Sequence, residues 1–175
     1  MKAGVLKLAF IVIALNLIFV YIGNEYLPQS ESKPPKVIKI AAGISQADLI
    51  SIGQKIVFGK GQCMVCHSER PETGERAPAM STIGAEVVKE AGARGISPEQ
   101  HMFEALVNPG AYIVKGFENI MSPINQPPTS LTDGEIIAVA AYLQSQGATV
   151  TISYPGSLPV LKAEEAKAAK AGVYK

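Results

Sequence analysis

The first 27 residues differ from the rest of the chain in their hydrophobic pattern. Residues 8–22 read LAFIVIALNLIFVYI, in which Asn16 is the only polar residue. Extended by a few residues at each end, this run has about the 20 residues that a helix needs to cross a bilayer. Lys2 and Lys7 precede the run, as in a secretory signal, but no small-x-small cleavage site follows it. We therefore expect residues 1–27 to form an uncleaved transmembrane anchor, and a cleaved signal or a buried soluble helix are the alternatives.

Helical periodicity and proline-rich segments alternate in the rest of the chain. Residues 28–44 contain Pro and Lys without apolar periodicity, which is typical of a linker. Apolar stripes that start behind a Ser or Thr predict three helices, at about residues 45–58, 97–108 and 132–147. No strand-rich pattern occurs before Thr149. The pattern therefore predicts an all-α fold.

Two segments do not fit this helical pattern. Residues 111–130 form a long segment with three prolines between the second and third predicted helices. Loops of about 20 residues without secondary structure are usually functional. Beyond residue 148 come a short β-like piece, TVTISY, and then, from Leu161, a run rich in Ala, Lys and Glu without a clear apolar face. We expect this run to be a solvated helix or disordered, unless a partner orders it.

Length and charge exclude several functions. The chain has 175 residues, enough for one ordinary domain with appendages. Its formal net charge is +1, and residues 28–175 contain 14 basic and 14 acidic side chains. No part of this balanced sequence resembles the clustered basic face of a nucleic-acid-binding protein. The sequence also has no glycine-rich nucleotide fingerprint and no nucleophile elbow.

The stretch GQCMVCHSE, residues 61–69 and called here the attachment stretch, holds the only two cysteines, Cys63 and Cys66, followed directly by His67. A redox pair of the thioredoxin type would need a βαβ unit, which the pattern lacks. A zinc site completed by His101 would need adjacent Cys66 and His67 on one ion, which structural sites rarely use. C-x-x-C-H is instead typical of covalently attached c-type haem, because two thiols reach the vinyl groups and the histidine binds the iron. We favour haem over a redox pair, zinc or two buried thiols.

The residues alone leave the second axial ligand of the iron open. Met121 is the preferred candidate, because the prolines of its loop can hold a thioether over the ring. Met80 and His101 are the alternatives. Met64 lies inside the attachment motif and cannot reach across the ring, and Met102 belongs to the expected core.

The chain from about residue 48 to 146 resembles a monohaem class I cytochrome c. The matching pieces are FGKGQCMVCHS, GFENIMSPI and LTDGEIIAVAAYLQSQG, and ALVNPGAYIVKGF is similar to cytochrome c domains attached to respiratory complexes such as haem-copper oxidases. The resemblance implies thioether bonds at Cys63 and Cys66 and axial ligation by His67 and Met121. The family commonly reads Met-Pro-Pro at this loop, whereas Ser122 here follows Met121.

The resemblance also implies an architecture. Gly53 and Phe58 on the first helix of the domain are expected to pack against Tyr142 on the last. We expect a transmembrane anchor at residues 1–27, a linker at 28–44, a class I cytochrome c-like helical domain around one haem c at 45–147, and a C-terminal extension at 148–175.

The expected function is one-electron transfer by a membrane-tethered carrier or a subunit of a respiratory complex, rather than catalysis. A haem-based sensor or small peroxidase with an open distal site is the alternative. The charges that flank the span do not decide its orientation. Covalent haem attachment implies the outer, periplasmic face of the bacterial cytoplasmic membrane for the haem domain. The expected partners are the membrane and redox subunits that donate and accept electrons, one of which the extension would contact.

Overall fold

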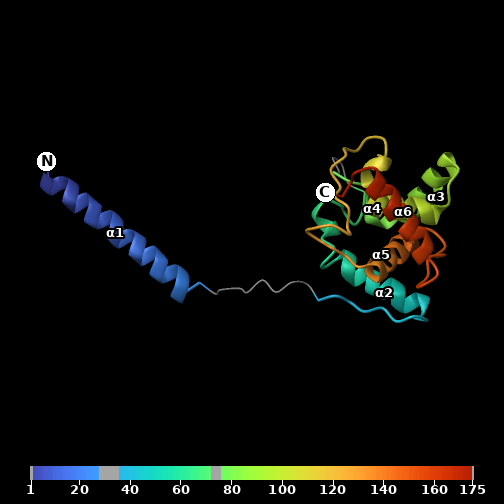
Figure 1. Cartoon of the computed structure of the whole chain (residues 1–175), viewed down its shortest axis with the longest axis horizontal. Coiled ribbons are helices and arrows are strands. Elements are labelled where there is room, and N and C mark those ends of the chain that lie inside the picture. Colours follow the sequence, from blue (N-terminus) through green and yellow to red (C-terminus); the bar gives the residue numbers. More distant parts are fainter. Residues whose placement is uncertain (1, 28–35, 72–75, 175) are drawn as a thin grey trace. The chain divides into compact units, whose positions relative to one another are not determined.

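The computed structural model describes residues 2–27, 36–71 and 76–174, and the chain divides into two units, residues 1–35 and 36–175. The described part of the first unit is the helix α1 (Lys2–Glu25) and the turn after it (Figure 1). Residues Ala3–Glu25 are long and apolar enough to cross a membrane, a property that anchors and signal sequences share. The predicted N-terminal apolar helix is therefore confirmed.

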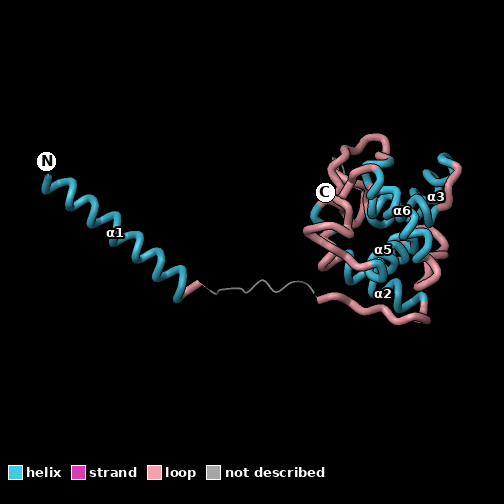
Figure 2. The backbone as a smooth tube through the Cα atoms, viewed as in Figure 1, coloured by secondary structure: helices cyan, strands magenta, loops and turns pink. Residues whose placement is uncertain are grey.

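The second unit contains helices and no strand within residues 36–71 and 76–174 (Figure 2). Its α-helices are α2 (Gln46–Val57), α3 (Ile83–Arg94), α4 (Pro98–Val107), α5 (Asp133–Ser145) and α6 (Leu158–Lys170). Short 3-10 turns lie between them, η1 (Cys63–Val65), η2 (Met80–Thr82) and η3 (Pro109–Ala111). The predicted all-α class is confirmed.

The three helices predicted from capping residues and apolar stripes are α2, α4 and α5. Ser45 and Ser97 each accept a hydrogen bond from the backbone N–H three residues further on, at 3.1 and 3.0 Å. Thr132 and Glu135 form a capping box at the start of α5. These side chains bind N–H groups that the first helical turn leaves unpaired, so they fix where each helix begins.

Helix α5 forms the centre of the core and is crossed by α2 at a very close contact. Residues 136–143 of α5 are all buried. A Cβ atom on Gly53 of α2 would lie 1.9 Å from the Ala138 carbonyl oxygen and 2.8 Å from the Tyr142 Cβ. Near the end of α2, the rings of Phe58 and Tyr142 meet edge to face with their centroids 6.3 Å apart. The packing that the family resemblance implies for these residues is confirmed.

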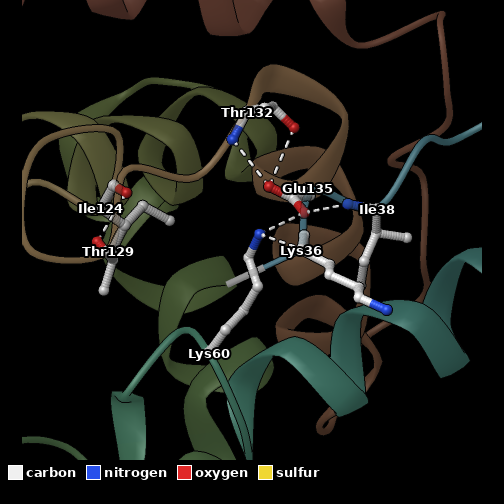
Figure 3. A network of polar contacts seen from close by, with 7 residues as sticks. All are labelled: Lys36, Ile38, Lys60, Ile124, Thr129, Thr132 and Glu135. Atoms are coloured by element: carbon white, nitrogen blue, oxygen red, sulfur yellow. Dashed lines mark hydrogen bonds and ion pairs between the residues drawn. The ribbon is translucent and has the colours of Figure 1, made fainter. Parts of the chain in front are cut away.

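The buried side chain of Glu135 joins three segments of the domain (Figure 3). Its Oε1 accepts hydrogen bonds from Lys60 Nζ at 2.6 Å and Ile38 N at 2.7 Å, and its Oε2 accepts one from Thr132 N at 3.0 Å. Burial alone would raise the pKa of Glu135, but these hydrogen bonds outweigh burial and hold the pKa below its ordinary value. Because Lys60 directly precedes the attachment stretch, the ion pair ties that stretch to α5.

Helix α3 was not predicted, because its contacts are those of backbone rather than of large side chains. Its buried positions are Gly84, Val87 and Ala91, and only Val87 has a large apolar side chain. The Gly84 N–H donates to the Gln146 carbonyl at 3.0 Å, and a Cβ on Gly84 would lie 2.4 Å from the Gln144 carbonyl oxygen. Close backbone contact with the end of α5 therefore holds this helix, and no apolar stripe indicates it.

The region after α5 corrects two expectations. The TVTISY piece is not a strand, because Gln144 Oε1 accepts from the N–H groups of Thr151 at 2.9 Å and Ile152 at 3.1 Å in place of a partner strand. The Ala-, Lys- and Glu-rich run is neither disordered nor fully solvated. It forms α6, which buries Leu161 and Ala168 and packs on α4. The chain itself orders the extension.

Candidate functional site

One cavity in the second unit brings together the residues that the sequence analysis singled out. Its volume is about 560 Å³, and it is lined by the attachment stretch, α3, α4 and the loop between η3 and α5. Its wall is largely apolar and includes Met80, Ile83, Val87, Met102, Leu106, Ile124 and Leu143. Cys63, Cys66, His67 and Met121 all line this cavity. The fold thus places a distant loop methionine at the same cavity as the attachment stretch.

The attachment stretch begins with a tight turn. Gln62 adopts a left-handed conformation with φ of 55°, and the N–H groups of Cys66 and His67 both donate to the Cys63 carbonyl, at 3.2 and 3.0 Å. Space is short at Gly61, where a Cβ would lie 2.7 Å from the Ile56 carbonyl oxygen and 3.3 Å from Cys63 Sγ. A glycine is needed here for the backbone to pass so close to the first thiol.

The first thiol of the pair does not have the character of a redox nucleophile. Neither cysteine forms a disulfide bond. Burial raises the pKa of the Cys63 thiol to about 11. A thioredoxin-type pair needs a lowered thiol pKa, because the thiolate is the nucleophile. The surroundings of Cys63 therefore disfavour the redox-pair hypothesis.

The imidazole of His67 is oriented by a backbone carbonyl. Its Nδ1 lies 2.7 Å from the Pro78 carbonyl oxygen. A carbonyl can only accept, so Nδ1 donates the hydrogen bond and the neutral ring has its free lone pair on Nε2. Histidines that bind metals commonly hold their second N–H in this way, because the bond fixes both the tautomer and the ring plane.

His101 also lies in the cavity wall, but its ring is committed to other contacts. It is 4% exposed, and its Nδ1 lies 2.7 Å from Nη1 of Arg94. Because arginine can only donate, Nδ1 accepts and Nε2 of the neutral ring carries the proton. Burial, and then the charge of Arg94, lower the pKa of His101. Neither nitrogen offers a free lone pair to a metal ion.

The charged surroundings of His101 form a cluster between α3 and α4. Arg94 pairs with Glu104 at 2.5 Å, and its guanidinium lies 4.4 Å from the centroid of the Tyr112 ring. The Tyr112 hydroxyl donates to Glu90. In the part of the chain that the structure describes, no three His, Cys, Asp or Glu side chains are placed to hold a metal ion. The zinc hypothesis, which needed His101 beside the two cysteines, is not supported.

Three methionines line the cavity, and they differ in burial. Met80 and Met102 are 3% and 2% exposed and belong to the hydrophobic core. Met121 is 37% exposed. Met64 packs against the core and does not line the cavity. Met121 is thus the cavity methionine whose thioether is least engaged in core packing.

The donor set of this cavity matches the chemistry of a c-type haem. Two thiols can form thioethers, one imidazole has its proton fixed away from a metal, a methionine sulfur is available, and the walls are apolar. These features are those of a helical haem-binding domain. The family model for cytochrome c matches residues 50–147, more than half of the chain. A comparison with curated proteins gives no match.

The chain belongs to the cytochrome c family. Membership implies a covalently bound c-type haem and a function in haem-based electron transfer.

Several residues of the site were not identified from the sequence. The cluster of Glu90, Arg94, Glu104 and Tyr112 lines or backs the cavity, yet its members are spread over three segments. The partner of His67 is the carbonyl of Pro78, which any residue could supply.

Proposed function

We propose that the protein carries one haem c, bound through thioethers at Cys63 and Cys66 and ligated by His67 and Met121, and acts as a one-electron carrier. The observation that carries the proposal is the cavity itself, at which both thiols, the oriented imidazole and a methionine meet. The haem would supply an iron that changes its charge by one unit. With His67 and Met121 both holding the iron, the site would exchange an electron without binding a substrate.

The chain's residues contribute by holding this group still in an apolar site. The hydrogen bond from His67 Nδ1 to Pro78 keeps Nε2 available in both redox states. The Lys60–Glu135 pair fixes the start of the attachment stretch to α5. These two restraints would keep the movement of the ligands on electron transfer small. These are the properties of a carrier rather than of an enzyme.

Three observations support Met121 over its alternatives as the second ligand. Met80 is buried in the core and would have to leave it to reach an iron. Both ring nitrogens of His101 are committed, because Nδ1 accepts a hydrogen bond from Arg94 and Nε2 is protonated. Met121 is partly exposed at the cavity and lies in a loop outside the helices. Moving Met121 to an iron therefore disrupts the least core packing.

Absorption spectra of the purified full-length protein test this assignment. Oxidised wild-type protein should show the weak methionine-to-iron band, and the reduced protein should not bind carbon monoxide. Met121→Ala should abolish the band and allow carbon monoxide to bind, whereas the control Met80→Leu should do neither. Loss of the band in Met80→Leu alone would overturn the assignment. A wild-type protein without the band that binds carbon monoxide would favour a sensor or peroxidase.

The covalent attachment has its own test. A haem-stained denaturing gel and the intact mass should show one haem per chain. Cys63→Ala with Cys66→Ala should leave no haem on the denatured chain, and either single change should leave one thioether at most. A denatured wild-type chain without haem would refute the proposal.

We propose further that residues 1–27 anchor the protein, residues 28–44 link, residues 45–147 form the haem domain and residues 148–175 extend it. The apolar helix α1 supports the anchor, because a helix on the surface of a soluble protein needs a polar face toward the solvent and α1 has none. The proposed location is the bacterial cytoplasmic membrane with the haem domain on the periplasmic face. A tether raises the local concentration of electron donor and acceptor subunits of a respiratory complex, so tight binding is not needed.

Fractionation and mass measurement test this location. The haem-carrying chain should sediment with membranes and be released by detergent but not by salt. Its mass should be that of the full chain with the N-terminal segment retained. A protease added to spheroplasts, which reaches only the periplasmic face of the membrane, should digest the haem domain. A chain that is shortened at its N-terminus and soluble would show a cleaved signal instead. Purification in mild detergent with mass identification of bound subunits would name the donor and acceptor.

A further inference from the structure

The loop that carries Met121 is attached on its C-terminal side to α4. The Ile124 N–H donates to the Leu106 carbonyl at 3.1 Å, and the Ile124 side chain is buried. The Ile124 carbonyl accepts from the Thr129 hydroxyl at 2.8 Å (Figure 3) and from Leu131 N–H at 2.9 Å. This fixed point lies three residues after Met121, so it restrains the loop close to the proposed ligand.

The next residue, Asn125, connects this point to the C-terminal extension. Its Nδ2 donates to Glu165 Oε1 of α6 at 3.0 Å and to the Tyr174 hydroxyl at 3.0 Å. The Tyr174 hydroxyl in turn donates to the Val107 carbonyl at 3.2 Å, at the end of α4. Asn125 Oδ1 is buried and has no partner within the described residues. The hydrogen bonds of this side chain therefore all go to the extension.

The extension is itself held firmly to the domain. Leu161 and Ala168 of α6 are fully buried. Lys162 binds Asp133 at the start of α5 and Glu165 on its own helix, at 2.8 and 2.7 Å. Glu165 is thereby positioned to accept from Asn125. Both Glu165 and Tyr174 lie outside residues 50–147, which match the cytochrome c family.

We propose that the C-terminal extension is a brace for the ligand loop, in which Tyr174 and Glu165 are positioning residues that hold Asn125 and so limit the release of Met121 from the iron. The proposal rests on the proposed role of Met121. An added ligand can replace Met121 only when the loop opens, and the brace lowers the population of the open loop. The extension thus controls how closed the iron site is, which gives it a role without any partner subunit.

Imidazole binding to the oxidised, full-length protein in detergent tests the brace. Tyr174→Phe keeps the ring and removes the hydroxyl, and it should raise the apparent imidazole affinity about fivefold to tenfold. The control is Tyr154→Phe, the same change in a tyrosine of the extension whose ring lies against Gly134, and it should leave the affinity within about twofold. Glu165→Ala should act like Tyr174→Phe, and Glu165→Gln, which retains an acceptor oxygen, should stay closer to wild type.

The Met121→Ala background separates the brace from the ligand assignment. There the site is open already, so imidazole should bind tightly and Tyr174→Phe should change nothing further. If Met121→Ala leaves both the methionine-to-iron band and the imidazole affinity unchanged, the proposed ligand is wrong. If Met121→Ala acts as expected but Tyr174→Phe and Glu165→Ala do not raise the affinity, the brace alone is refuted. An equal effect of Tyr174→Phe in both backgrounds would also refute it, because general loosening would then explain the change.

Discussion

The crossing of α2 and α5 allows a sharp test of the fold, because it has no room for one methyl group. A Cβ on Gly53 would lie 1.9 Å from the Ala138 carbonyl oxygen, 2.6 Å from the Ala138 carbonyl carbon and 2.8 Å from the Tyr142 Cβ. For the first contact to reach 3.0 Å, the two backbones would have to separate by at least 1.1 Å. Since two of the three atoms are backbone, no change of rotamer relieves the overlap.

The expected cost exceeds that of an ordinary overpacked core. Inserting a methyl group into a packed core costs about 1–3 kcal/mol, and a helix pair that must part along its length also loses contacts on both sides. We therefore expect Gly53→Ala to lower the free energy of unfolding by about 3 kcal/mol or more. Because α5 supplies Leu143 to the cavity wall, the haem site should loosen as well.

Urea unfolding of the full-length protein in detergent, followed by far-ultraviolet circular dichroism, measures this cost. Gly92→Ala is the matched control, because Gly92 lies on α3 with open space around its Cβ position. In a helix interior that change should raise the free energy of unfolding by about 0.5–1 kcal/mol. A Gly53→Ala protein within about 0.5 kcal/mol of wild type would refute the reasoning, since the observed crossing could not then exist.

Three further predictions concern the attachment stretch and two buried ionisable groups. Gly61→Ala should reduce the fraction of chains that carry haem on a denaturing gel, because its Cβ would meet the Ile56 carbonyl at 2.7 Å, and a normal fraction would contradict this. Glu135→Gln should destabilise the protein by about 1–3 kcal/mol at neutral pH. Because the folded-state pKa of Glu135 is lowered, the difference from wild type should be present above the ordinary value of 4.5 and disappear as the pH falls through the folded-state pKa. His101→Asn keeps an acceptor for Arg94 and should flatten the pH dependence of the free energy of unfolding. Because the folded-state pKa of His101 is lowered, this histidine gives wild type a contribution to stability that is complete above pH 6.5. That contribution is lost as the pH falls from 6.5 to the folded-state pKa, and the variant lacks it. Urea midpoints measured across pH test both variants, and parallel curves for wild type and variant would contradict either prediction.

The sequence was informative where one residue type carries a local physical signal. Ser45, Ser97 and Thr132 predicted the starts of α2, α4 and α5, because a hydroxyl cap acts within three residues. The C-x-x-C-H spacing predicted a c-type haem, because all three residues of this motif lie close together in the chain. The prolines around Met121 and the family resemblance predicted that this distant methionine would face the cavity, and it is one of three methionines that do so. Their burial, which separates Met121 from the other two, depends on tertiary packing that no local pattern contains.

The sequence was uninformative where tertiary contacts replaced local ones. Helix α3 is held through Gly84, whose missing side chain gives no apolar signal. TVTISY has the composition of a strand, but a strand forms only where a partner strand can pair with it. Here the side chain of Gln144 accepts the backbone hydrogen bonds that a partner strand would accept. The buried positions of α6 are Leu161, Glu164 and Ala168, which follow helical spacing, but a glutamate in the middle hides the stripe.

That glutamate supports a last prediction, in which a buried charge weakens the helix that it helps to pack. Glu164 is 1% exposed, and its Oε2 has no partner within the described residues. Its Oε1 pairs with Lys167 at 2.6 Å, a lysine whose side chain is 55% exposed.

Glu164→Met should therefore raise the free energy of unfolding by about 1 kcal/mol, because it removes an unpaired buried oxygen, retains helix propensity and lets Lys167 return to solvent. Lys167→Met is the matched control. It leaves the carboxylate buried without its partner and should lower the free energy of unfolding by about 1–3 kcal/mol. Urea midpoints for the two variants should move in opposite directions. If both fall equally, the pair stabilises α6, and the charge is then part of what orders the extension.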